Sequence, residues 1–479
     1  MRKAFAAGTT LLLLLVASIA PASAVVTAAV DLPTGLGPVS SDNVTYHGTI
    51  PIDSPGVGGE VVVREDLGGK KFFYATGGKG LSVYDISDPA LPVLTGYLAF
   101  PHLQNEDLKV SDDGTKAMIA ADGALLVGLM PSQTGIHIVD VTDPATPTVV
   151  GSSSPFIRGD GNSFGQAEHT AECANADCTV IYGRTGRIYD ASELPLVKEI
   201  GRWNKDLSGA DVGGIHALNR DESGLVISDS HPRLVLDPRD DPRNPVVLAQ
   251  GTRSRRDDRL QHNNVRPDAQ AWVPRDPDDP ADAVEYTTVT PGARVESATD
   301  VRPVMRPGEM FIGNSETNLN NNCNAAGGLS TWSMVNFDKG AQLQQLEVFK
   351  PLNGNWADGS PARNGLGCSG HWFTENDGYV TASWYEHGVR FFKVDKTVGT
   401  IEEVGYFQPV ATEAGAAYWV DDEFVYSVDY ARGIDIISFD RGADEPTQAE
   451  LDASWLANNG RVGALAAAER YLCALGAKD

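Results

Sequence analysis

A pattern of an apolar strand, an acidic residue and a turn recurs along most of the chain. In its clearest copy, Leu81 to Leu98, apolar residues lead into Asp85, a Ser-Asp-Pro turn follows, and a second β-rich segment runs to Leu98. Seven copies can be aligned on the acidic residue: SVYD at Asp85, HIVD at Asp140, RIYD at Asp190, LVLD at Asp237, VNFD at Asp338, FKVD at Asp395 and ISFD at Asp440. The repeat predicts an all-β protein built from similar units.

The spacing of these acidic residues predicts one four-stranded propeller blade per repeat. Their separations are 55, 50, 47, 101, 57 and 45 residues, so only the fourth interval is doubled. That interval contains a Pro-, Asp- and Arg-rich segment, from about 266 to 308, whose composition is typical of an exposed loop. The sequence therefore predicts a seven-bladed β-propeller with one large insertion.

The two ends of the predicted propeller differ from the repeats. The sequence after Asp440 has no β-branched run, whereas Asn43 to Ile50 has the pattern of the missing strand, so we expect an N-terminal strand to close the ring. We therefore place the propeller at 43–442. A helical tail should follow at 443–479, with Trp455 as an anchor on the propeller wall; a partner-binding tail is the alternative. Helical spacing is shown by Val462, Leu465, Leu472 and Leu475.

The N-terminus has the pattern of a cleavable signal peptide. Arg2-Lys3 is a basic region, Leu11 to Ile19 is apolar, and Ala22-Ser23-Ala24 is a small-residue cleavage signal. We expect a signal peptide over 1–24, cleavage after Ala24, a linker over 25–42 and a secreted protein. A membrane anchor is not expected, because the apolar run is too short for a stable span and no cysteine follows it for lipidation.

The net charge limits the classes of molecule that the protein is expected to bind, and the cysteines predict disulfides. The net charge of -26 and the pI near 4.6 argue against binding to the nucleic-acid backbone, and an acidic surface that keeps the protein soluble is the simplest interpretation. Five cysteines in an exported chain favour disulfides. We expect Cys173–Cys178 and Cys323–Cys368, one of fifteen possible arrangements, with Cys473 left over.

The repeat resembles that of the LVIVD-repeat β-propellers of bacteria and archaea. Residues 80–96 (GLSVYDISDPALPVLTG) and 135–151 (GIHIVDVTDPATPTVVG) carry the likeness; the copies at Asp190 and Asp237 match in part, and the last three lack the Ser-Asp-Pro turn. The resemblance implies the propeller fold over roughly 43–442 and offers no catalytic residues to transfer. A fainter likeness to the selenium-binding protein and methanethiol oxidase propellers rests on histidines near blade starts.

Histidines and carboxylates recur where the inner strand of each blade is expected to begin. Counting back from the acidic residues gives Gly59-Glu60, Glu106-Asp107, Glu168-His169, Ile215-His216, Gln261-His262, Gly370-His371 and Glu413. Inner strands line the central channel of a propeller, so these side chains could hold a divalent transition metal. Candidate ligands are His169, His216, His262, His371, Glu60, Glu106 and Glu413. The alternative is that each histidine is a repeat signature, hydrogen-bonded to the backbone of a neighbouring blade.

Two functions remain open from the sequence. One is a binding or scaffold module whose loops on one face of the disc hold a protein, a glycan or a small molecule, with Glu172, Asn263, Arg266 and Trp372 as candidate contacts. The other is a metal-dependent oxidase or hydrolase. Catalytic residues cannot be assigned, because spacing alone assembles no nucleophile, base and orienting group.

Overall fold

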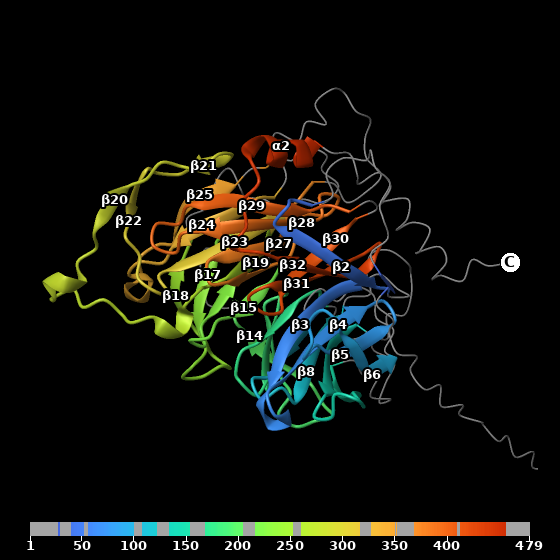
Figure 1. Ribbon diagram of the computed structural model, residues 1–479. Helices are drawn as coiled ribbons and strands as arrows, with labels where there is room; N and C mark the ends of the chain where they lie inside the picture. Colours follow the sequence, from blue (N-terminus) through green and yellow to red (C-terminus); the bar gives the residue numbers. More distant parts are fainter. Residues whose placement is uncertain are drawn as a thin grey trace, which may run out of the picture.

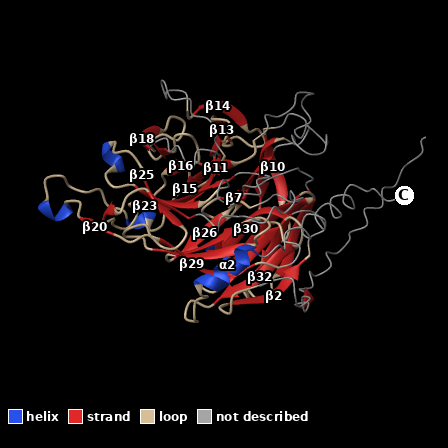
Figure 2. Ribbon diagram, turned by 90° about the horizontal axis from the view of Figure 1, so that it is seen from above, coloured by secondary structure: helices blue, strands red, loops and turns tan. Residues whose placement is uncertain are grey.

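The chain forms seven antiparallel sheets arranged as the blades of a propeller (Figure 1). The computed structural model describes residues 27–28, 40–51, 56–99, 108–121, 134–153, 168–204, 216–251, 260–316, 327–349, 351, 368–409 and 412–456. Seen from above, this part consists mostly of strands, with helical turns at its edge (Figure 2). The predicted seven-bladed β-propeller is confirmed.

Blades 1 to 4 each take four consecutive strands in sequence order. Blade 1 contains β3 (Gly56–Arg64), β4 (Lys70–Gly77), β5 (Gly80–Asp85) and β6 (Val93–Ala99), with the short η1 (Glu65–Leu67) after β3. Blade 2 contains β7 (Leu108–Val110), β8 (Lys116–Ala121), β9 (Gly135–Asp140) and β10 (Thr148–Ser152). Blade 3 contains β11 (Ala171–Cys173), β12 (Val180–Gly183), β13 (Arg187–Asp190) and β14 (Lys198–Arg202). Blade 4 contains β15 (Leu218–Arg220), β16 (Val226–Ser228), β17 (Leu234–Asp237) and β18 (Val246–Gln250).

Blade 5 departs from this plan by an insertion, and blade 7 departs from it by closure of the ring. Blade 5 contains β19 (Leu260–Val265), β23 (Met310–Glu316), β24 (Leu329–Ser333) and β25 (Gln344–Phe349), with η5 (Phe337–Lys339) between the last two strands. Blade 6 contains β26 (Phe373–Asn376), β27 (Tyr379–Ser383), β28 (Val389–Val394) and β29 (Ile401–Phe407). Blade 7 contains β30 (Ala414–Trp419), β31 (Phe424–Asp429), β32 (Gly433–Phe439) and the N-terminal β2 (Val44–Ile50).

Strand β2 closes the ring, as the sequence predicted. It pairs antiparallel with β32, from Val44 opposite Phe439 to Ile50 opposite Ile434. A further short strand, β1 (Thr27–Ala28), pairs with β2 from within the predicted linker. Because main-chain hydrogen bonds hold the start of the chain in the last blade, and the chain continues from β2 into β3, the first and seventh blades are neighbours in the ring.

The predicted insertion lies between β19 and β23. It holds η3 (Ala269–Ala271), η4 (Pro280–Asp282), β20 (Tyr286–Thr288), β21 (Val295–Ser297) and β22 (Val301–Pro303). Strands β20 and β22 pair in a hairpin that projects from the disc at the left of Figure 1, whereas β21 returns to pair with β25 as a fifth strand of blade 5. The excursion is therefore more than an exposed loop, because part of it covers an outer sheet edge.

The acidic residue of the repeat builds the turn after the third strand of a blade. Its Oδ1 accepts the backbone N–H two residues on, at 2.8–3.1 Å, as in Asx turns; this bond is present at Asp85, Asp140, Asp190, Asp237, Asp395 and Asp440. The alignment at Asp338 was wrong: this residue lies in η5, and the third strand of blade 5 ends earlier, at Ser333. The apolar run before Asp338 belongs to a turn whose Phe337 is buried against Trp272 of the insertion.

The glycine that ends the repeat allows the next blade to approach closely. Gly96, in β6, faces the next blade so closely that a Cβ there would collide with the Pro144 carbonyl oxygen. At the same position of blade 3, a Cβ on Gly201 would meet no atom within 4 Å. Both glycines sit beside the register shift between the third and fourth strands. The repeat glycine is therefore required by packing in one blade and not in the other.

The tail begins with helix α2 (Gln448–Leu456), and residues 457–479, including Cys473, lie outside the described residues. Trp455 is buried against Trp384, with ring centroids 5.5 Å apart, and the Arg390 guanidinium lies 3.8 Å from its ring centroid. The indole N–H donates to Glu403 at 2.9 Å. Trp455 thus anchors the helix on blade 6, as expected.

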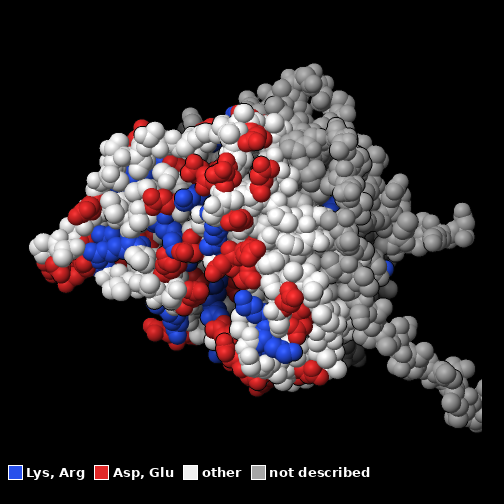
Figure 3. All heavy atoms as spheres, in the orientation of Figure 1, with Lys and Arg blue, Asp and Glu red and all other residues white. Residues whose placement is uncertain are grey.

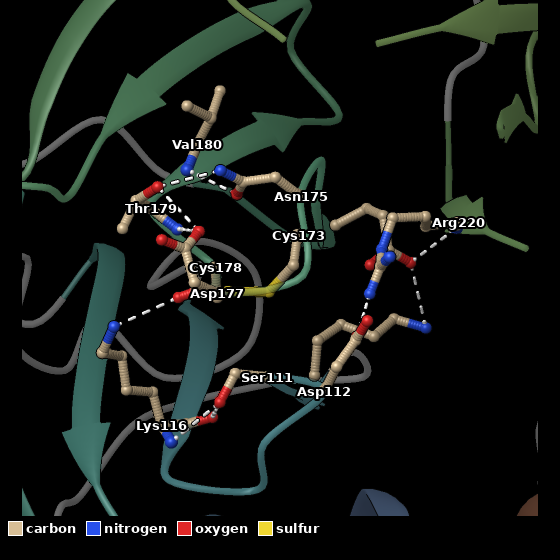
Figure 4. Close-up of a disulfide and its surroundings, with 12 residues drawn as sticks. Ser111, Asp112, Lys116, Cys173, Asn175, Asp177, Cys178, Thr179, Val180 and Arg220 are labelled. Atoms are coloured by element: carbon tan, nitrogen blue, oxygen red, sulfur yellow. Dashed lines mark hydrogen bonds and ion pairs between the residues drawn. A yellow bond between two sulfur atoms is a disulfide. The ribbon is translucent and has the colours of Figure 1, made fainter. Parts of the chain in front are cut away.

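One of the two predicted disulfides is present among the described residues. Cys173, at the end of β11, is bonded to Cys178 in the turn to β12, where Lys116 of blade 2 donates to the Asp177 carbonyl at 3.2 Å (Figure 4). Cys368 is buried and disulfide-bonded, while Cys323 lies outside the described residues, so that pairing stays a prediction.

The distribution of charged side chains on the surface agrees with the acidic composition of the chain. Acidic side chains are interspersed with basic ones over the described face in Figure 3, without a continuous basic patch on that face. In the part of the chain that the structure describes, no helix has the length and apolar character needed to span a membrane.

The two repeat glycines give a matched test of blade packing. We expect Gly96→Ala to destabilise the propeller by about 1–3 kcal/mol, because the added methyl group must displace the backbone of the next blade. Gly201→Ala should be neutral or stabilising by up to about 1 kcal/mol, because the strand backbone is compatible with alanine. Unfolding midpoints of the two variants would measure the difference, and equal midpoints would contradict the packing argument.

Candidate functional site: a row of histidines in the central channel

Four histidines from four consecutive blades form one row. His169, His216 and His371 precede the inner strands β11, β15 and β26, and His262 lies near the start of β19. Successive ring centroids are 4.7, 3.9 and 4.1 Å apart, and the four residues are 8%, 3%, 0% and 1% exposed, in chain order. Because the inner strands are the ones that line the channel of a propeller, the row lies along the central channel. The structure therefore brings together all four histidines that the sequence singled out.

Glu316 joins the row from the second strand of blade 5. Its Oε2 lies 3.6 Å from His262 Nε2, and it is 2% exposed. Single ligand atoms of His216, His262 and Glu316 lie within 4.8 Å of one another. Tyr385, in the turn before β28, donates its hydroxyl hydrogen to Glu316 Oε1 at 2.5 Å. Two imidazoles and a carboxylate held by a further hydrogen bond are a typical donor set for a transition metal.

The distance between His169 and His216 also suits metal ligation. Their Nε2 atoms are 3.1 Å apart. Two nitrogens bound to one ion at the usual bond lengths are separated by about 2.9–3.4 Å for angles between a right angle and the tetrahedral value. The same distance suits an N–H···N hydrogen bond, so the pair is positioned for either interaction. Because His216 also belongs to the group with His262 and Glu316, it is the central residue of the row.

His371 makes the contact that the structural alternative predicted. Its Nδ1–H donates to the carbonyl of Gly415 in β30 of the neighbouring blade, and its own carbonyl accepts from the Asn314 side chain. A backbone hydrogen bond of this kind fixes the orientation of the imidazole, which is also how metal-bound histidines are commonly held. His371 is thus oriented by blade 7, and its ring lies against both His262 and Tyr385.

A buried ion pair supports the strand that carries His262. Arg233 pairs with Asp229, and its Nε donates to Gln261 Oε1 at 2.8 Å. Asn264 donates to Asp229 Oδ2 at 2.6 Å, so both sides of His262 are tied to blade 4. Burial raises the pKa of Asp229 to about 6, while Arg233 and Asn264 favour its ionised form. Sequence reasoning missed this pair, because neither residue lies at a blade entry.

Two of the three predicted carboxylates, Glu60 and Glu413, are described, and neither belongs to the described group of possible metal ligands. Glu60 lies in β3 and lines a pocket described below, and burial raises its pKa to about 7. Glu413 precedes β30 and is buried, with its backbone N–H donating to Asp429 Oδ2 at 2.9 Å. Glu106 lies outside the described residues. The carboxylate grouped with the histidines is Glu316, which the prediction did not include.

The predicted ligand-binding residues lie farther along the inner strands. Asn263, Arg266 and Trp372 line a cavity of about 350 Å³, whereas Glu172 is not part of the lining and pairs with the lining residue Lys109 at 3.4 Å. Arg266 is held by a 2.7 Å ion pair with Asp221 and lies over the rings of Trp272 and Phe337. The Trp372 ring meets the His262 ring edge-on at 6.2 Å. Trp372 therefore contacts both the histidine row and the cavity.

Comparison with known protein families identifies the repeat. The LVIVD repeat model matches residues 69–99 and 132–154, which include the third and fourth strands of blades 1 and 2. No curated protein matches. The chain is similar in structure to the β-propeller domain of Cps50 (Swd1) from Myceliophteria thermophila, with a TM-score of 0.48, 11% identity, and coverage of 83% of this chain and 99% of that domain.

A second similar structure is a putative 6-phosphogluconolactonase from Bacteroides uniformis. Its TM-score is 0.45 at 12% identity, with coverage of 73% of this chain and 84% of that one. The fainter likeness to selenium-binding protein and methanethiol oxidase propellers is untested by these matches. The chain is a seven-bladed β-propeller that contains LVIVD repeats.

Proposed function

We propose that this protein is an exported β-propeller that binds a divalent transition-metal ion in its central channel. The observation that carries the proposal is the convergence of His216, His262 and Glu316, from blades 4 and 5, within one buried space. Imidazole and carboxylate donors together suit zinc, copper, manganese and iron. His169 and His371 flank this group on either side and could complete or orient the coordination.

A metal-dependent oxidase or hydrolase is the second candidate. Three protein ligands leave coordination positions for water or a substrate, and a metal bound in this way supplies Lewis-acid or redox chemistry. The binding of a protein, glycan or small molecule through the loops of one face stays a prediction, since most of the connections between successive blades lie outside the described residues.

Metal binding can be tested on the full-length chain purified without a polyhistidine tag. We expect about one equivalent of a transition metal by elemental analysis, and loss of that metal in a His216→Ala, His262→Ala double variant and in a His169→Ala, His216→Ala double variant. Tyr385→Phe should weaken binding by about tenfold, because it removes the hydrogen bond that orients Glu316.

The matched control is His47→Ala, since His47 lies on the closing strand and bonds to Ser438 at 2.8 Å, away from the row. This variant should keep its metal. The proposal fails if the chain takes up no stoichiometric zinc, copper, manganese or iron in titrations, or if the control loses as much metal as the channel variants.

Export is part of the proposal and has its own test. The Cys173–Cys178 disulfide supports an oxidising compartment, and the N-terminal pattern supports a cleavable signal. Expression with the native N-terminus in a secreting bacterial host should yield protein outside the cytoplasm whose first residue is Val25, by intact mass. Protein retained in the cytoplasm with residues 1–24 still attached would contradict export.

A further inference from the structure

A second site lies in the same channel, beyond the histidine row. Its cavity, about 350 Å³, is lined by later positions of the inner strands, including Asn219, Asn263, Thr374 and Tyr418. The histidines instead lie at or before the starts of the same strands. Trp372 and a chain of hydrogen bonds separate the two places: Lys109 donates to Asn219 and Asn219 donates to Asn263, each at 2.9 Å. The cavity is therefore a compartment distinct from the histidine row.

Aromatic rings form part of its lining. Trp372, Tyr418 and Trp419 come from blades 6 and 7, and Phe373 lies beside them. Their positions are fixed by hydrogen bonds: Tyr418 Oη accepts from the Gly59 N–H at 2.8 Å, and the Trp419 indole donates to the Tyr379 carbonyl at 3.0 Å. The Lys109 amine lies 5.3 Å from the Trp372 ring centroid, so this ring already makes a cation–π contact within the protein. Rigid aromatic rings of this kind favour cationic ligands.

The charges of the lining favour the same ligands. It contains five acidic and three basic residues, and each basic side chain has an acidic partner. Lys109 pairs with Glu172, Arg220 with Asp112 and Arg266 with Asp221. No described ion pair involves the carboxylate of Glu60 or Glu375, and burial raises the pKa of both. The uncompensated charge of the cavity is therefore negative.

We propose that this cavity binds a small organic ammonium ion, with the cationic group between Glu60 and the aromatic wall. Such a cation would offset the desolvation of the Glu60 carboxylate and interact with the π-faces of Trp372 and Tyr418. The proposal is independent of metal binding, because none of the four histidines lines the cavity.

Proton linkage gives the site a pH dependence with a definite sign. The Glu60 pKa of about 7 means that part of the population is protonated at neutral pH, and a cation binds the ionised form. Affinity should therefore rise between about pH 6 and about pH 8, and binding should release protons. The neighbouring charged groups, Lys109 and Glu172, form an ion pair with each other.

Isothermal titration calorimetry with two isosteric probes tests the proposal. Choline carries a quaternary ammonium group, and 3,3-dimethyl-1-butanol has the same shape without the charge. We expect choline to bind and the alcohol to bind at least about tenfold more weakly, a difference typical of a desolvated cation–π and carboxylate site. Glu60→Gln should weaken choline binding by about tenfold and flatten its pH dependence.

Control variants distinguish a specific effect of Glu60 on choline binding from a general effect of removing a carboxylate. Glu375 also lines the cavity, but its carboxylate already accepts the Gly378 N–H, so Glu375→Gln should weaken choline binding less than Glu60→Gln; Glu65→Gln, on the exposed η1, should leave it unchanged. The His216→Ala, His262→Ala variant should still bind choline, so failure of metal binding and failure of this proposal are distinguishable. Equal affinity for the neutral alcohol, unchanged affinity in Glu60→Gln, binding of a neutral sugar in place of choline, or no choline binding up to about 10 mM would each overturn it.

Discussion

Pairing of β2 with β32 is the interaction on which the rest of the molecule depends. Each blade buries its faces only against its neighbours, so an open ring would expose the apolar faces of the first and seventh blades. The strand that closes the ring comes from residues 44–50, and its partner strand lies near the other end of the propeller sequence. Core clusters bridge the junction: Ile50 and Phe73, from the closing strand and blade 1, are buried with Tyr426 of blade 7. Closure of the ring therefore determines how the blades are placed around the central channel as well as how their faces pack.

The channel site follows from this closure. A row in which each imidazole touches the next can form only if blades 3 to 6 approach the axis at the same height. Buried hydrogen bonds between blades maintain that height: Arg233 of blade 4 reaches the Asn314 carbonyl of blade 5 at 3.1 Å, and Asn263 of blade 5 reaches the Phe373 carbonyl of blade 6 at 2.9 Å. Polar groups in such a dry interior are costly unless they are paired, which makes the arrangement specific.

The fold and the histidines could be predicted because both depend on regular spacing. The Asx turn after the third strand recurs at a near-constant interval, and the inner strand begins a nearly constant distance before it. Counting therefore located His169, His216 and His371, which lie 21, 21 and 24 residues before their acidic residues, whereas His262 lies 76 residues before Asp338 and was found only by allowing for the insertion. The same counting failed at Asp338, because a buried phenylalanine in a turn imitates the end of a strand. Several expectations for the loops and the tail fall on residues outside the described ranges, among them Glu106 and Cys323.

Glu316 could not be found by counting, because it ends a second strand and reaches the axis only through the geometry of blade 5. A signal was nevertheless present: the apolar start of β23 gives way to a polar run from Gly313 to Glu316, and a polar run that continues a buried strand requires partners.

The channel holds two chemically different environments, and Trp372 explains how they stay separate. Its ring contacts both His262 and the Lys109 amine, and the Asn219–Asn263 amide pair is hydrogen-bonded to the same amine. Imidazole donors thus gather at the row, while the cavity keeps an excess of carboxylates within the same seven blades.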